Sequence, residues 1–158
     1  FKYLVNWLRQ LKPDLAISSD IIVGFPGETE QHHLRSLEFV RQIKFSRLHV
    51  FKYSPRPGTP AADFPEQVPA KVKDRRSKEM IALGEEMARD YRSTFIGSIE
   101  EVLVEEVDSA LYGEGFTPHY IRVKTALPEK GPRWQGKLIP VRLEREEGSI
   151  LIGTPQLE

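Results

Sequence analysis

The sequence predicts an α/β unit followed by an all-β unit. Apolar residues recur at helical spacing in residues 2–12 and 34–43, and each segment is joined to a largely apolar run, in residues 16–25 and 48–53. The order helix, strand, helix, strand is typical of a parallel sheet with right-handed crossovers. At Gly97 the apolar period changes from 3.6 to 2. The short alternating segments that follow, with glycines between them, indicate a small antiparallel barrel.

Composition excludes several classes of protein. The 158 residues are 39% hydrophobic and 29% charged, which is typical of a soluble globular chain rather than a disordered one. No apolar run approaches the roughly 18 residues of a membrane span. The chain has no cysteine, so disulfides, a thiol nucleophile and a cysteine-held metal within it are excluded. It opens on Phe1 in the middle of a helical pattern, and we therefore expect it to be part of a longer protein.

The two parts of the chain differ in charge, and we place the domain boundary between them. Residues 1–92 hold 16 Lys and Arg against 12 Asp and Glu, whereas residues 93–158 hold 7 against 11. The first part therefore has a balance of +4 and the second of −4, and neither is a polybasic tail.

Two helices follow the first predicted strand. Thr29 is a candidate N-cap, with Glu28 and Glu30 close to the positive end of the helix dipole. A proline-rich connection over residues 54–69 leads into a second helix over residues 69–95. The predicted buried stripes are Leu34, Leu37, Val40 and Ile43 on the first helix, and Val72, Met80, Leu83, Met87 and Tyr91 on the second. The charged residues of the second helix, Arg76 among them, are expected mostly off its stripe.

Glycines and a helix start follow the first predicted strand. Ligands of α/β sheets bind beyond the carboxyl ends of the strands. Gly24 and Gly27 permit close backbone approach or a positive φ, and the start of the next helix offers N–H groups. The turn is either a ligand site or a tight connection, and the spacing alone fits both.

The second strand also ends in a candidate site. Phe51, Tyr53 and Ser54 could line a pocket, and Arg56 could meet a phosphate or carboxylate. The alternative is that the two aromatic residues are core and Arg56 is solvated, which we favour for Arg56.

The barrel segment carries a candidate RNA-binding face. Small RNA-binding barrels combine basic groups with aromatic rings on which bases stack. The residues of this kind are Phe116, Tyr120, Arg122, Lys124 and Arg142. We expect Tyr120, Arg122 and Lys124 to share one outward face beside Arg142, and Gly113 and Gly115 to flank a turn. The acidic balance argues against a strong non-specific grip on a nucleic acid, so a purely structural barrel is the alternative.

Catalytic and metal-binding constellations are not predicted. The four histidines have no partners at metal-ligand spacing, and the adjacent pair His32 and His33 points in two directions on a helix. No nucleophile and base pair up in the sequence.

Two long motifs carry a resemblance to a known family. The run DIIVGFPGETEQ at residues 20–31 and the run RLHVFKYSPRPGTPAA at residues 47–62 resemble the radical S-adenosylmethionine (SAM) methylthiotransferases, which insert a sulfur and a methyl group at a C–H position. The β-segment looks like the TRAM domain of these enzymes. Two such motifs at this separation are far more specific than one glycine motif.

The resemblance implies the architecture and the cofactors. Residues 1–92 would be the C-terminal part of the radical-SAM core domain, the end of a partial parallel (β/α) barrel, and residues 93–158 the TRAM domain. The family uses SAM and two 4Fe-4S clusters, whose cysteine ligands this chain lacks, so we expect the chain alone to be inactive. The cavity for SAM and substrate would be lined by Ile22, Gly24, Phe51, Tyr53 and Ser54.

The resemblance also implies a substrate and a partner. The segments at residues 44–51 and 115–123 look most like the enzymes that act on threonylcarbamoyl-adenosine beside the anticodon. The implied partner is the anticodon stem-loop of a tRNA, with no DNA or membrane, and the implied location of the protein is the cytoplasm. The alternatives are an isopentenyl-adenosine substrate, an aspartate of a ribosomal protein, or a non-catalytic RNA-binding module.

Overall fold

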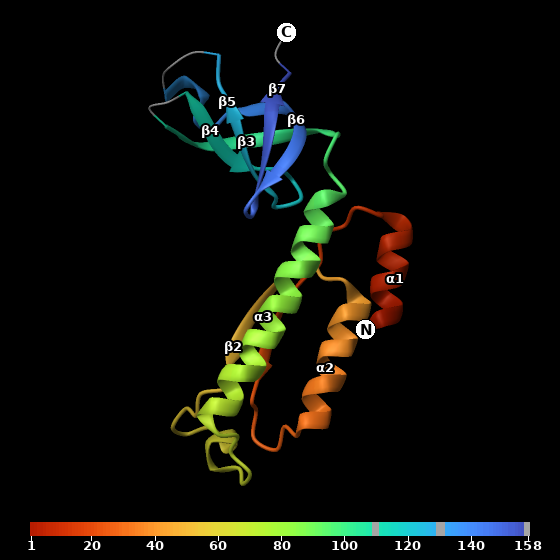
Figure 1. Ribbon diagram of the computed structural model, residues 1–158, viewed down its shortest axis with the longest axis vertical. Coiled ribbons are helices and arrows are strands. Elements are labelled where there is room, and N and C mark those ends of the chain that lie inside the picture. The colour runs from red at the N-terminus through yellow and green to blue at the C-terminus, as the bar shows by residue number, and fades with distance from the viewer. Residues whose placement is uncertain (109–110, 129–131, 157–158) are drawn as a thin grey trace. The chain divides into compact units, whose positions relative to one another are not determined.

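The computed structural model describes residues 1–108, 111–128 and 132–156. The chain divides into two compact units, Phe1–Ala88 and Arg89–Glu158. The division falls within a long helix, four residues before the boundary that we predict from charge and pattern. The first unit mixes helices and strands, and the second contains a closed barrel (Figure 1).

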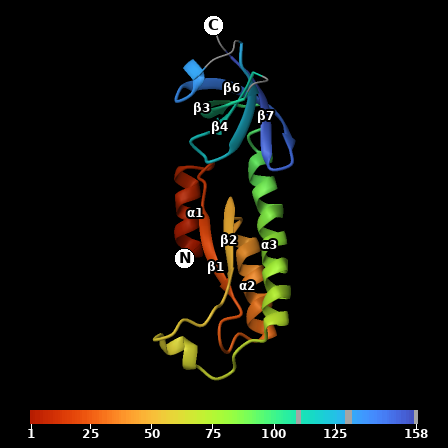
Figure 2. The same cartoon turned by 90° about the vertical axis from the view of Figure 1, so that its left-hand side faces the viewer.

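A two-stranded parallel sheet is the centre of the first unit. Ile22 pairs with Phe51 across the two strands, and their parallel direction is the one that the order of elements predicts. Figure 2 shows the two strands lying side by side. The elements of this unit, in chain order, are α1 (Lys2–Leu11), β1 (Ser18–Val23), α2 (Glu30–Ile43), β2 (Arg47–Lys52), η1 (Pro60–Asp63) and α3 (Ala70–Ser93).

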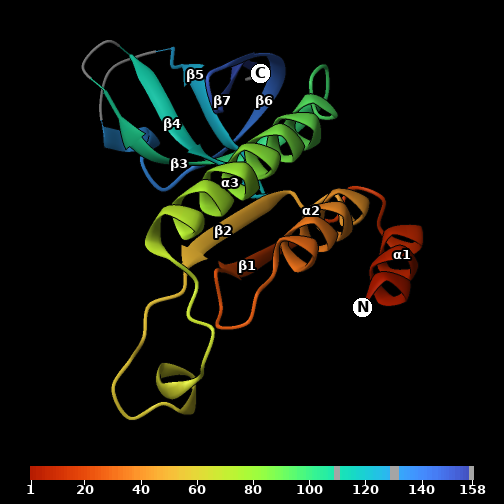
Figure 3. The same ribbon diagram turned by 60° about the horizontal axis from the view of Figure 1, so that its bottom comes forward.

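Helices α2 and α3 lie on the same side of this sheet (Figure 3). The residues of β1 and β2 that alternate toward them, such as Val23 and Val50, pack with apolar side chains of both helices. The buried members of this core are Val5, Val23, Val40, Ile43, Phe45, Met80, Leu83 and Met87. On the opposite face Ile22 is 57% exposed and Phe51 is 52% exposed, so that one face of the sheet is open.

The buried faces of α2 and α3 differ from the predicted stripes most clearly at Leu34, His33 and Arg76. Leu34 is exposed, while its neighbour His33 is fully buried. Arg76, expected off the apolar stripe of α3, is only 4% exposed. The reason is polar pairing between distant segments, because His33 contacts Glu79 and Arg76 contacts Glu28.

The second unit is a closed barrel of five strands. Its elements are β3 (Ile99–Val107), β4 (Tyr112–Phe116), β5 (Arg122–Ala126), η2 (Pro132–Trp134), β6 (Leu138–Glu147) and β7 (Ile150–Pro155). The strand order around the ring is β3-β4-β5-β7-β6, and β6 pairs with β3 to close it. The small β-barrel that the sequence predicts is therefore confirmed.

One strand pair of the barrel is parallel, so the prediction of a fully antiparallel barrel is wrong. Val123 of β5 pairs with Leu151 of β7 in parallel register, whereas the other four pairs are antiparallel. Neighbours in a closed ring of five strands cannot alternate in direction all the way round. An odd number of strands therefore requires a parallel pair.

The inward side chains of the barrel form its core, as the period of 2 predicts. Val102, Val104, Val123, Val141, Leu143 and Leu151 are fully buried. Gly113 and Gly115 lie on the inner side of β4 rather than beside a turn, which corrects the prediction. A Cβ at Gly115 would overlap the backbone carbonyl of Leu103, so this glycine permits two strands to approach closely.

Candidate functional site

The turn after β1 is held by its own glutamate. Gly24 and Gly27 have φ values of +73° and +80°, as the prediction of positive φ allows. The Gly24 N–H donates to the Glu28 carboxylate, with 2.5 Å between nitrogen and Oε2. Glu28 therefore binds the strand end rather than stabilising the α2 dipole from a free position.

The start of α2 is capped by side chains from the same helix. The predicted N-cap is confirmed, because Thr29 Oγ1 accepts a hydrogen bond from the His32 N–H at 3.2 Å. In turn, Nδ1 of the His32 ring accepts a hydrogen bond from the Thr29 N–H at 3.3 Å. The cap therefore occupies one of the N–H groups that the start of α2 was expected to offer to a ligand.

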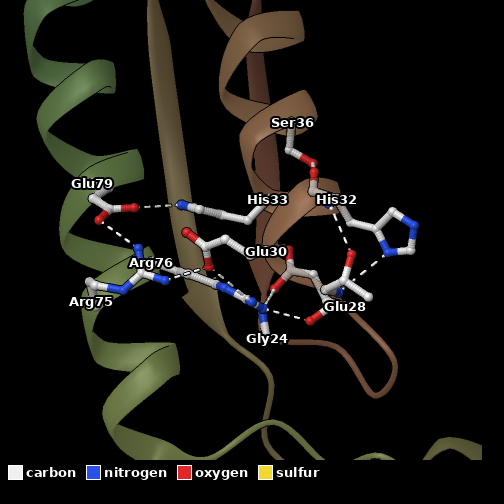
Figure 4. Close-up of polar contacts among 10 residues, drawn as sticks. Gly24, Glu28, Glu30, His32, His33, Ser36, Arg75, Arg76 and Glu79 are labelled. Carbon is white, nitrogen blue, oxygen red and sulfur yellow. Dashed lines mark hydrogen bonds and ion pairs between the residues drawn. The ribbon is translucent and has the colours of Figure 1, made fainter.

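A network of charged residues joins α3 to this turn (Figure 4). Arg76 Nη1 donates to both the backbone oxygen and Oε2 of Glu28, each at 2.8 Å. Arg75 donates to Glu30 at 2.5 Å and to Glu79 at 2.8 Å. Glu79 also contacts the buried His33 at 2.7 Å. The turn after β1 and the first half of α3 are therefore one connected polar structure.

The network shifts the acidity of its exposed members. The hydrogen bond from Arg75 lowers the pKa of Glu30, and the same guanidinium lowers the pKa of Glu79 with a smaller contribution from His33. Hydrogen bonds to Glu30 and Glu79 raise the pKa of Arg75. Exposed pairs of this kind contribute little to stability. The Arg76–Glu28 pair is different because both side chains are largely buried, and removal of one partner would leave an uncompensated charge.

The open face of the sheet, formed by outward residues of β1 and β2, holds two of the predicted SAM-site residues side by side. Ile22 and Phe51 are direct cross-strand partners on it. Tyr53 continues the parallel pairing beyond β2, since its N–H donates to the Val23 carbonyl at 2.9 Å. Gly24 and the exposed Ser54 follow at the ends of their strands. All five predicted residues therefore lie at the carboxyl end of the sheet.

The sequence analysis missed the polar part of the open face. Asp20 pairs with His49, and Ser18 pairs with Arg47, in the rows next to Ile22 and Phe51. These four polar residues are all exposed, whereas their inward neighbours Ser19 and Leu48 are partly buried. The period of 2, counted back from Ile22 and Phe51, would have identified them.

The tip of the β4–β5 hairpin gathers three of the predicted RNA-binding residues. Phe116 and Arg122 are the last cross-strand partners of the hairpin. Tyr120 lies in the connecting turn, with a φ of +58° and 80% of its surface exposed. The strand starts at Arg122, so Tyr120 does not belong to the alternation that we predict for residues 120–124.

Acidic groups pair with the barrel cations. Arg122 and Lys124 point outward as predicted, and both contact Glu114, at 2.8 Å and 3.5 Å. Lys124 also lies 4.9 Å from the centre of the Tyr112 ring. Arg142 is on β6, which β7 separates from β5, and its side chain donates to the Gly97 carbonyl at 3.3 Å. The structure therefore does not bring Arg142 beside the other cations.

A row of outward apolar side chains continues from Phe116, and the sequence analysis missed it. Leu103 pairs with Phe116 on one side and with Leu138 on the other. Leu103 is 40% exposed and Leu138 is 60% exposed. The cross-strand row therefore consists of Leu138, Leu103 and Phe116, and it ends at the cation Arg122. The sequence does contain a sign of this row, because Leu103 and Leu138 are apolar residues at positions of an alternating strand that normally face outward and are polar.

The described part of the chain has neither a cluster of potential metal ligands nor a membrane-spanning helix. Residues 1–108, 111–128 and 132–156 contain no group of three potential metal ligands. No helix among these residues combines the length and apolar character needed to cross a membrane. With no cysteine in the sequence, the residues present do not fit an iron–sulfur cluster.

Comparison with models of known protein families gives no match. Comparison with curated proteins gives relatives along most of the chain. The chain is 36% identical over 152 residues to the tRNA-2-methylthio-N(6)-dimethylallyladenosine synthase of Akkermansia muciniphila, and the alignment covers 96% of this chain and 33% of that protein. It is 42% identical over 123 residues to the threonylcarbamoyladenosine tRNA methylthiotransferase MtaB of Bacillus subtilis, covering 75% of this chain and 27% of that protein.

The chain belongs to the tRNA methylthiotransferase family. The family that the two strand-end motifs predict is thereby confirmed. The chain spans about a third of the length of the curated methylthiotransferases it matches. Both motifs, and the strand ends they form, lie in the first unit.

Proposed function

We propose that this chain supplies the end of the radical-SAM domain and the TRAM domain of a cytoplasmic tRNA methylthiotransferase. The complete enzyme adds a methylthio group to C2 of threonylcarbamoyl-adenosine beside the anticodon. The observation that carries the proposal is the similarity to tRNA methylthiotransferases along most of the chain, which includes both strand-end motifs. Catalysis belongs to the complete enzyme, because the cluster ligands are not in this sequence.

The open sheet face supports a role in SAM binding. A parallel sheet is normally covered on both faces, whereas β1 and β2 are covered by helices on one face only. In the complete enzyme the open face would line the inside of a parallel barrel, and its carboxyl end is where such barrels bind ligands. The apolar pair Ile22 and Phe51 offers a surface for the adenine ring. SAM bound there would supply the deoxyadenosyl radical that removes hydrogen, and a second SAM molecule would supply the methyl group.

The polar rows of the open face support the threonylcarbamoyl substrate. A threonylcarbamoyl group carries a carboxylate and a hydroxyl, whereas a dimethylallyl group is a hydrocarbon. His49 could bind a carboxylate, and Asp20 could accept a hydrogen bond from a hydroxyl, whereas Ser18 and Arg47 lie at the amino ends of their strands. A wholly apolar face would suit the dimethylallyl group better. The dimethylallyladenosine synthase that aligns with 96% of the chain favours that second candidate.

The hairpin tip of the barrel supports a role in binding the anticodon stem-loop. Sequence-specific RNA recognition targets unpaired bases that stack on aromatic rings and arginine planes. Tyr120 is exposed for such stacking, and Phe116 lies directly opposite Arg122. Lys124 follows on the same strand face, and Arg142 would contact RNA separately.

Mass spectrometry of tRNA nucleosides from a strain that lacks the complete gene tests the proposal. We expect the methylthio form of threonylcarbamoyl-adenosine to disappear and to return when the gene is restored. Loss of the methylthio dimethylallyl form instead would favour the second candidate. Loss of a methylthio-aspartate from a ribosomal protein would point to that substrate. Unchanged nucleosides and proteins would leave a non-catalytic RNA-binding module.

A further inference from the structure

Lys73 contacts the ends of both strands of the open sheet. It lies in the first turn of α3, and its Nζ donates to the Tyr53 carbonyl at 3.0 Å. Its methylene stem lies against Gly24, because a Cβ added at Gly24 would be 2.8 Å from Lys73 Cδ and closer still to Cγ. Gly24 directly follows β1 and Tyr53 directly follows β2. One side chain therefore spans the two strand ends.

The Gly24 peptide is held from a second direction. Its N–H donates to Glu28, and the same carboxylate oxygen accepts from the buried Arg76 at 2.8 Å. The left-handed φ of Gly24 excludes most other residues, and the stem of Lys73 fills the space that a side chain would need. The close approach that the sequence predicts at Gly24 is thus made by Lys73.

The position of Tyr53 depends on Lys73 as well. The Lys73 ammonium lies 5.5 Å from the centre of the Tyr53 ring, in addition to its bond to the backbone. The ring meets Phe25 edge-on at 5.1 Å. The Tyr53 hydroxyl is buried and forms no hydrogen bond with the described residues, so it does not fix the ring by itself.

We propose that Lys73 is a positioning residue for the SAM site. Together with the backbone hydrogen bond from Tyr53 to Val23, it holds the ends of β1 and β2, and it acts on the ligand only through Gly24 and Tyr53. The inference rests on the proposed function, because it assumes that the strand ends contact SAM. Displacement of these groups would weaken their contacts with SAM, and a tenfold loss of affinity corresponds to about 1.4 kcal/mol.

Two substitutions separate the effect of the Lys73 ammonium from the effect of its methylene stem. Lys73→Met keeps a stem over Gly24 and removes the ammonium, whereas Lys73→Ala removes both. Lys71→Met is the matched control, since Lys71 is exposed on the same turn of α3. Each variant is made in the complete enzyme with its clusters loaded, and the measurements are the Kd for SAM, the thermal midpoint, and the KM for SAM against kcat.

We expect Lys73→Met to raise the Kd and KM for SAM about tenfold, because the contacts at the strand ends weaken, with a smaller change in kcat and a thermal midpoint close to that of Lys71→Met. Lys73→Arg, which keeps a donor, should restore part of the affinity. If Lys73→Ala does not fold, Lys73→Met still decides the question. Equal SAM affinity in Lys73→Met and Lys71→Met would overturn the inference. Failure of the unaltered enzyme to bind SAM would instead overturn the proposed function.

Discussion

Tyr120 combines an exposed ring with an unfavourable backbone conformation. A non-glycine residue with positive φ costs about 1–2 kcal/mol, and such residues gather at functional sites. The Tyr120 N–H donates to the Thr117 carbonyl at 3.0 Å, which holds the tight turn at the hairpin tip. The turn therefore keeps the ring outward at some cost to the stability of the barrel.

Tyr120→Gly should separate the two properties. Glycine adopts a positive φ without strain, so we expect the free energy of unfolding to stay within about 1 kcal/mol of the original value. Loss of the ring should weaken anticodon stem-loop binding by about 1–3 kcal/mol, the usual value for one stacked base. Urea denaturation and a binding titration on the complete enzyme measure these effects. Binding that stays unchanged would remove Tyr120 from the RNA face.

At the scale of secondary-structure elements, α3 is joined to the β1–α2 turn by carboxylates whose protonation depends on pH. Glu30 and Glu79 have pKa values below their ordinary 4.5, chiefly because Arg75 donates a hydrogen bond to each. A carboxylate with a lowered folded-state pKa adds stability that is fully present above its ordinary pKa. That stability is lost as the pH falls through the lower value of the folded state.

Arg75→Met should therefore reduce the acid sensitivity of the protein. We expect the unaltered protein to lose more stability than the variant when the pH is lowered from about 6 to about 3.5, because the variant has no Arg75 to lower the two pKa values. Urea unfolding at both pH values measures the difference. Arg41→Met, on an exposed pair with Glu38, is the control. Identical losses in all three proteins would contradict the prediction.

Periodicity predicted the elements better than their contacts. The period of 2 predicted the inward residues of the barrel, and the order helix, strand, helix, strand predicted the parallel sheet that holds Ile22 and Phe51. It could not give the burial of His33 and Arg76, because their partners lie 46 and 48 residues away in the sequence. Polar pairing of this kind leaves no repeat in either segment, so Leu34 was assigned to a core that His33 occupies.

At the scale of the whole molecule, charge is unevenly distributed between the two parts. The residues from 93 onward have a balance of −4, and Glu114 already pairs with Arg122 and Lys124. The RNA binding that we propose for the barrel would therefore rely on local contacts and stacking rather than on a broad positive field. Each phosphate contact adds about 0.7 to the salt slope for single strands.

The contribution of the barrel to the salt dependence should consequently be small. We expect Arg122→Ala with Lys124→Ala to make the slope of log K against log salt shallower by no more than about 1.4, the value for two phosphate contacts. Binding of the anticodon stem-loop to the complete enzyme across a salt series provides the slope. A change well above that value would mean that further phosphate contacts are lost with these two side chains.

The odd number of strands in the barrel has a consequence for where the ring opens. The parallel joint between β5 and β7 has three pairs in register, whereas the antiparallel joint between β3 and β6 has five. Parallel pairing is also slightly weaker per residue. Thermal fluctuations should therefore separate β5 from β7 first, and backbone amides at that joint should exchange with deuterium sooner than those between β3 and β6. Because Val123 and Leu151 line this joint, its opening would briefly expose the core of the barrel to water.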